Sequence, residues 1–95
     1  MDETLGACAV DLSGRPYFVV NLQLKGERIE DMAGEDLIHF FESFALNAKI
    51  NLHVRVLYGE NDHHKAESAF KALAHALKKA IKIQGTEVPS TKGVL

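Results

Sequence analysis

The sequence predicts an α+β fold in which a small sheet carries its helices on one face. Some segments place apolar residues at every second position, as half-buried strands do. Others repeat them every three or four positions, as amphipathic helices do. The length is the third observation: 95 residues supply surface for one core, so we expect residues 1–95 to form a single module. The predicted order is β-β-α-β-α, with an antiparallel or mixed sheet.

Three segments have the features of strands. Residues 5–12 are apolar with several small side chains, and Gly14 and Pro16 then favour a turn. Residues 17–24 alternate with a period of two, so we expect a second strand that pairs with the first as a hairpin. Residues 50–57 alternate in the same way and are predicted to be the third strand.

Two segments have the helical period. Residues 34–48 follow a charged connection at residues 25–34 and repeat apolar side chains on one face. The second helix is expected to start near residue 62, with Asn61 or Asp62 as its N-cap, and to run to about residue 83. Gly85 is expected to end this helix, and residues 88–95 to be extended and irregular. The predicted core stripe of the second helix is Phe70, Leu73, Leu77 and Ile81.

Composition excludes several classes of function. The net charge of −2 offers no basic excess for a polyanion, and no strand carries a basic and aromatic stripe, so nucleic acid is not an expected partner. The apolar runs are too short to span a membrane, and the acidic start lacks the basic region of a signal peptide. The single cysteine, Cys8, excludes an internal disulfide and suits a reducing compartment. We therefore expect a cytoplasmic protein.

The strongest chemical signal is the segment His63-His64-Lys65-Ala66-Glu67 at the start of the second helix. His63 and Glu67 are one turn apart and could share a metal ion. His64 diverges from His63 by about 100°, so it would have to reach a second ion. The positive end of the helix dipole disfavours imidazolium and keeps both rings available as ligands. The spacing matches neither the H-E-x-x-H nor the H-x-x-E-H zinc motif.

Structural explanations remain open for each histidine. His63 also continues the apolar stripe of its helix, so it could simply cap the core. His39 lies opposite the apolar stripe of the first helix, where it is either solvated or a ligand aimed at another subunit. His53 and His75 are expected to be structural or solvated.

A second group of residues is suited to bind phosphate. Arg15 lies in the first turn, Lys71 lies one helical turn beyond Glu67, and Lys92 follows Ser90 and a threonine in the tail. Cations beside a hydroxyl and free turn N–H groups suit a phosphate. Each of these cations, taken alone, is better explained as a surface charge.

Five motifs together resemble the imidazoleglycerol-phosphate dehydratase family. The resemblance covers the whole chain in order and is closest to the C-terminal of the family's two tandem modules, so the fold would be one half of a duplicated-module fold. The motifs are Asp-Leu-Ser-Gly-Arg-Pro at residues 11–16, His-Phe-Phe at 39–41, Gly-Glu-Asn-Asp-His-His at 59–64 followed by Glu67, Phe-Lys-Ala at 70–72, and Val-Pro-Ser-Thr-Lys-Gly-Val-Leu at 88–95.

The resemblance implies a carbon–oxygen lyase of histidine biosynthesis. Such enzymes are manganese-dependent and dehydrate imidazole glycerol phosphate to imidazole acetol phosphate. They form large, symmetric homo-oligomers in which two Mn²⁺ ions bind the substrate imidazole at sites between subunits. Carried over to this sequence, the implied metal ligands are His39, His63, His64 and Glu67. The implied contacts to the substrate phosphate are Arg15, Lys71, Ser90 and Lys92.

The resemblance also implies what a single module lacks. The family's first module brings a second H-H-x-x-E helix, another histidine ligand, another phosphate-binding arginine and the acid/base glutamate. No catalytic acid or base is therefore assigned here. Two hypotheses follow. Copies of the chain associate and supply the missing ligands to one another, or the chain is a half-module that folds, oligomerises and binds metal without turnover.

Overall fold

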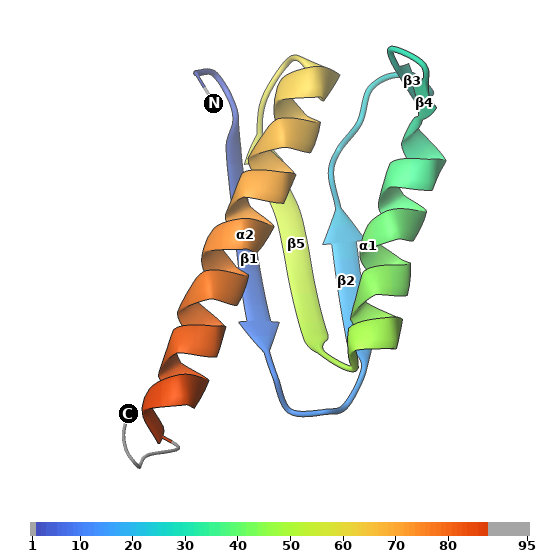
Figure 1. Cartoon of the computed structure of the whole chain (residues 1–95). Coiled ribbons are helices and arrows are strands. Elements are labelled where there is room, and N and C mark those ends of the chain that lie inside the picture. Colours follow the sequence, from blue (N-terminus) through green and yellow to red (C-terminus); the bar gives the residue numbers. More distant parts are fainter. Residues whose placement is uncertain (1, 88–95) are drawn as a thin grey trace.

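The computed structural model describes residues 2–87, with side chains described through residue 83. A three-stranded sheet is covered on one face by two long helices (Figure 1). The sheet contains β1 (Leu5–Asp11), β2 (Tyr17–Asn21) and β5 (Asn51–Tyr58), and the helices are α1 (Gly34–Ala48) and α2 (Asp62–Glu87). This is the α+β fold with helices on one face that the sequence predicts.

The strand order is β1-β5-β2, so the predicted hairpin between the first two strands is wrong. β5 lies between them, antiparallel to β1 and parallel to β2. The path from β2 through α1 to β5 is a crossover connection, which places β5 beside β2 with the same direction. Alternating hydrophobicity shows which face of a strand is buried, but it does not identify the strand's neighbour. The hairpin therefore had no support beyond the short turn.

Helix boundaries follow the sequence signals at three of four ends. α1 occupies residues 34–48 as predicted. Asn61 is the N-cap of α2, because its side-chain oxygen accepts the backbone N–H of His64 at 3.0 Å. Gly85 does not end α2, which continues to Glu87. A glycine inside a helix costs only about 1 kcal/mol relative to alanine, so it does not by itself stop one.

The connection before α1 is more ordered than predicted. β2 ends at Asn21, short of the predicted residue 24, and Gln23 takes a left-handed φ of 52°. The following residues form a small two-stranded sheet of β3 (Arg28–Ile29) and β4 (Met32–Ala33). Glu30 lies in the turn between β3 and β4 with a φ of 54°.

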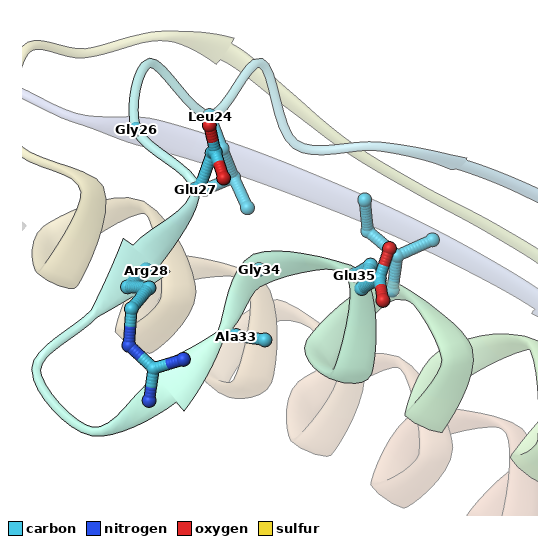
Figure 2. A pocket seen from close by; sticks show the side chains of 8 residues that line it. Leu24, Gly26, Glu27, Arg28, Ala33, Gly34 and Glu35 are labelled. Carbon is cyan, nitrogen blue, oxygen red and sulfur yellow. The ribbon is translucent and has the colours of Figure 1, made fainter.

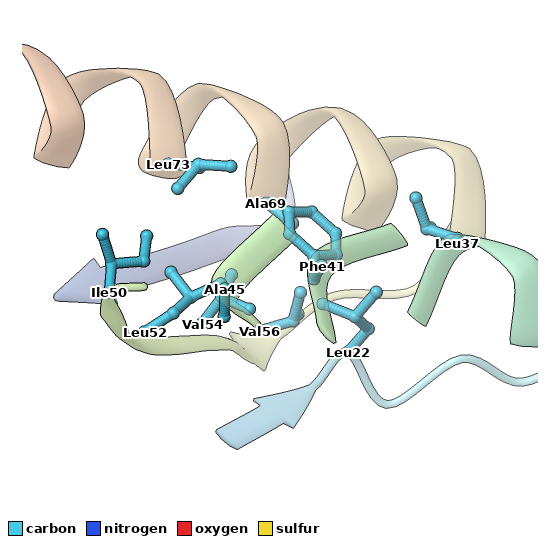
Figure 3. Close-up of a cluster of buried hydrophobic side chains, with 10 residues drawn as sticks. All are labelled: Leu22, Leu37, Phe41, Ala45, Ile50, Leu52, Val54, Val56, Ala69 and Leu73. Atoms are coloured by element: carbon cyan, nitrogen blue, oxygen red, sulfur yellow. The ribbon is translucent and has the colours of Figure 1, made fainter. Parts of the chain in front are cut away.

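The core lies between the sheet and the helices (Figure 3). Leu52, Val54 and Val56 of the central strand are fully buried beneath both helices. The intervening His53 is exposed on the uncovered face beside Tyr17, and His75 is exposed on α2, so both are solvated as expected. The remaining buried hydrophobic residues are Leu22, Leu37, Phe41, Ala45, Ile50, Ala69 and Leu73.

The described part of the chain contains no helix with both the length and the apolar composition needed to cross a membrane.

Close packing of α2 on β1 depends on Gly6. A Cβ at this position would lie 2.6 Å from Oγ of Ser68 and 3.2 Å from the Ser68 carbonyl. We expect Gly6→Ala to lower the free energy of unfolding by about 1–3 kcal/mol, because helix and strand must separate. Gly26→Ala is the matched control, since its nearest neighbour would be at 3.5 Å. Equal denaturation midpoints for the two variants would contradict this explanation.

Candidate functional site

The amino-terminal turn of α2 presents two adjacent histidines to different partners. His63 Nε2 lies 2.8 Å from Glu67 Oε1, one turn along the same helix. His64 Nδ1 lies 2.6 Å from Oε1 of Glu3, a residue that precedes β1. The two rings therefore diverge, as the angle between neighbouring helical residues requires.

His63 is held between two carboxylates. Its Nδ1 lies 2.9 Å from Oε2 of Glu30, in the β3–β4 turn, and its Nε2 contacts Glu67. The side chains of His63 and Glu30 are 50% and 75% exposed, so the pair lies at the surface. An ion bound by both His63 and Glu67 would replace the hydrogen bond that now joins them.

A mostly apolar cavity of about 240 Å³ lies beside His63 and Glu67. His63 therefore also borders apolar side chains, as its place on the helix stripe suggested. The other residues that line the cavity are Ile29, Glu30, Met32, Leu37, Ala66 and Phe70.

Glu3, like Glu30, is a residue of this region that sequence reasoning missed. Its Oε2 accepts the backbone N–H groups of Asn61 at 2.9 Å and of Glu60 at 3.1 Å. The donation from Asn61, then the contact with His64, then the donation from Glu60 hold the pKa of Glu3 well below its ordinary value. No local pattern could reveal this role, because Glu3 and His64 are 61 positions apart in the sequence.

The same end of α2 is tied to the segment after β2. The Asp62 carboxylate accepts the backbone N–H groups of Lys25 at 3.0 Å and Gly26 at 2.8 Å. Burial alone would raise the pKa of Asp62, but these two donors together with the nearby Lys65 ammonium lower the pKa. Lys65 is buried and donates from Nζ to the carbonyl of Gln23 at 2.5 Å. The backbone that carries both histidines is therefore fixed on two sides.

His39 lies on the exposed face of α1. Its Nε2 is 3.5 Å from Oγ of Ser43, and it borders an open hollow of about 430 Å³ with Glu35 and Glu42. This orientation, away from the core of its own module, is the one expected from the sequence. Among the side chains that the structure describes, no three His, Cys, Asp or Glu residues form a group that could hold a metal ion.

The predicted phosphate ligands are spread over the molecule. Arg15 is exposed in the β1–β2 turn, at the opposite end of β1 from the start of α2 (Figure 1). The seven residues of β1 span about 20 Å. Lys71 is exposed on α2, eight residues beyond His63 and so about 12 Å along the helix axis. Ser90 and Lys92 lie outside the described residues.

A hollow of about 600 Å³ lies where the β3–β4 segment meets the start of α1 (Figure 2). None of the predicted site residues lines it. The residues that do are Leu24, Gly26, Glu27, Arg28, Ala33, Gly34, Glu35 and Ile38.

Several relatives align with this chain over its whole length. It is 59% identical to the imidazoleglycerol-phosphate dehydratase of Kluyveromyces lactis over 96 aligned positions, which cover 100% of this chain and 43% of that protein. It is 53% identical to the enzyme of the same name from Roseiflexus sp., of which it covers 49%. It is also 55% identical to the histidine biosynthesis bifunctional protein HisB of Xanthomonas campestris, of which it covers 25%. The chain thus spans half or less of the length of these relatives.

Comparison of the fold with solved structures finds proteins of the same name. The crystal structure of imidazoleglycerol-phosphate dehydratase from Staphylococcus aureus superposes with a TM-score of 0.78 at 40% identity, over 81% of this chain and 45% of that one. The structure from Pyrococcus furiosus superposes with a TM-score of 0.73 at 39% identity, over 81% of this chain and 43% of that one. The sequence profile of the family matches residues 1–77. On these grounds the chain belongs to the imidazoleglycerol-phosphate dehydratase family.

Proposed function

We propose that the chain is one module of a manganese-dependent imidazoleglycerol-phosphate dehydratase, corresponding to the C-terminal of two tandem modules. The proposed reaction is the dehydration of imidazole glycerol phosphate to imidazole acetol phosphate in histidine biosynthesis. Family membership and the share of the relatives' length that the chain covers support this proposal.

The observation that carries the proposal is the divergence of His63 and His64. His63 faces Glu67 on one side of the helix, while His64 turns toward Glu3 on the other. One helix end therefore contributes to two ligand sets and completes neither. A site with two metal ions, each shared with another module or subunit, needs this arrangement.

The available donors fit Mn²⁺. Imidazole nitrogens and carboxylate oxygens bind manganese, although they also suit iron, nickel and zinc. We assign His63 with Glu67 to one ion and His64 to the other, and His39 to an ion held by a neighbouring subunit. Bound Mn²⁺ would act as a Lewis acid that also orients the substrate imidazole.

The residues proposed to contact phosphate would bind and orient the substrate. Arg15, Lys71, Ser90 and Lys92 are proposed to hold the phosphate, away from the bond that breaks, and so to supply orientation. Arg15 and His64 lie near opposite ends of β1, so one chain does not direct both at the same small molecule. The site we propose therefore lies between subunits of a homo-oligomer.

The second candidate function is a half-module that binds metal and assembles but does not turn over substrate. The share of the relatives' length that the chain covers, which is half or less, favours it. Turnover of imidazole glycerol phosphate by the purified chain with Mn²⁺ separates the two. Product formation that chelation abolishes supports the dehydratase, whereas a folded, manganese-loaded oligomer without turnover supports the half-module.

The proposed ligands can be tested with His64→Ala. Because an imidazole ligand is lost at a site that joins subunits, we expect Mn²⁺ affinity to fall at least tenfold and the oligomer to dissociate more readily. Titration calorimetry and native mass spectrometry measure the two effects. His75→Ala is the control, since His75 is exposed farther along the same helix. Unchanged manganese binding in His64→Ala would refute the assignment.

The phosphate assignment can be tested with Arg15→Ala. Loss of the guanidinium should weaken binding of inorganic phosphate to the manganese-loaded chain about tenfold, because the paired charge is removed. Manganese content should stay the same. Arg55→Ala, which removes an exposed guanidinium from the uncovered face of β5, should change neither quantity. Loss of manganese in Arg15→Ala would show that Arg15 has a different role.

A further inference from the structure

We propose that Glu3 is a positioning residue that fixes the His64 ring with Nε2 as its metal-binding atom. The inference rests on the proposed function, because it concerns how one of the proposed ligands is prepared. It adds a residue from the segment before β1 to a set of proposed metal ligands that all lie on helices.

The Glu3 carboxylate is itself held in place. Its Oε2 accepts two backbone N–H groups, from Glu60 and Asn61, in the turn that leads into α2. Its Oε1 is thereby directed at Nδ1 of His64, at 2.6 Å. Both side chains are about one-third exposed, at 34% for Glu3 and 32% for His64. The carboxylate therefore reaches the ring from a fixed backbone position.

This contact selects the tautomer of His64. An ionised carboxylate only accepts hydrogen bonds, so Nδ1 must carry the proton. In the neutral ring the lone pair then lies on Nε2, the atom left to bind a metal. Among the residues whose side chains the structure describes, none forms a hydrogen bond or ion pair with Nε2 of His64. A carboxylate on the far nitrogen also fixes the ring's orientation and makes the ligand more basic.

His63 provides an internal comparison. Its Nδ1 also meets a carboxylate, that of Glu30 at 2.9 Å, but Glu30 is 75% exposed. Within the described part of the chain, the Glu30 carboxylate is contacted by His63 and accepts no hydrogen bond from any other residue. Its Nε2 is already engaged by Glu67. Glu30 can therefore move with its solvated side chain, whereas Glu3 cannot.

A purely structural role for Glu3 predicts different behaviour. If Glu3 only tied down the turn before α2, its contact with His64 would be incidental. Glu3→Gln separates the two roles. The amide oxygen can still accept the backbone N–H groups of Glu60 and Asn61, while the amide nitrogen would donate to Nδ1 of His64. The proton of the ring would then move to Nε2 and block the metal-binding atom.

The tautomer is read directly from the ring nitrogen chemical shifts in long-range ¹H–¹⁵N spectra of the full, metal-free chain, in the pH range where the ring is neutral. We expect the His64 proton on Nδ1 in the wild type and on Nε2 in Glu3→Gln. Titration calorimetry with Mn²⁺ alone should show 10–100-fold weaker binding in Glu3→Gln. Glu27→Gln, the matched control, removes an exposed carboxylate beside the hollow that no predicted site residue lines, and it should change affinity by less than about threefold.

The wild-type spectrum keeps the proposal falsifiable even if Glu3→Gln does not fold, because a proton on Nε2 of His64 in the wild type would overturn it. A folded Glu3→Gln chain with unchanged tautomer and manganese affinity would overturn it as well. Failure of the wild type to bind Mn²⁺ would instead count against the proposed function, since the tautomer is measured without metal.

Discussion

The antiparallel register of β1 on β5 is the constraint on which the candidate site depends. It pairs Leu5 with Tyr58, and so places the residues before β1 beside those that follow β5. The residues after β5 form the loop that leads into α2 and then the first helical turn of α2. Glu3 thereby meets Glu60, Asn61 and His64, although they lie 57 to 61 positions away in the sequence. A slip of one residue would turn every β1 side chain to the other face and would remove Glu3 from His64.

Helical and strand periods were sufficient to predict both helices and the three strands of the main sheet, but not the order of those strands or the small sheet of β3 and β4. The stripe from Leu37 to Phe44 defined α1, and the Asn61 cap defined the start of α2, because both signals are local. The position of β5 between β1 and β2 depends on tertiary packing, since alternation is satisfied beside either neighbour. The continuation of α2 past Gly85 likewise depends on a small energy difference that one residue does not decide.

The same distinction separates the predicted from the missed site residues. His63, Glu67 and His64 lie within one helical turn, so their relative directions follow from helix geometry alone. Glu3 contacts His64 and Glu30 contacts His63, each from outside the helix, and no local sequence pattern marks either carboxylate. The distance between Arg15 and the histidines followed only from the direction of β1. In the proposed function, a chain spanning half or less of its relatives' length would contribute separate portions of a site.

The most direct test of this account is an anomalous difference map from crystals of the chain grown with Mn²⁺ and recorded at the manganese edge. The account predicts a manganese peak within bonding distance of Nε2 of His64, with Glu3 still on Nδ1. It also predicts a separate peak at His63 and Glu67. A peak on Nδ1 of His64, with Glu3 displaced, would contradict it. Manganese bound elsewhere in the crystal, with none at the start of α2, would contradict it as well.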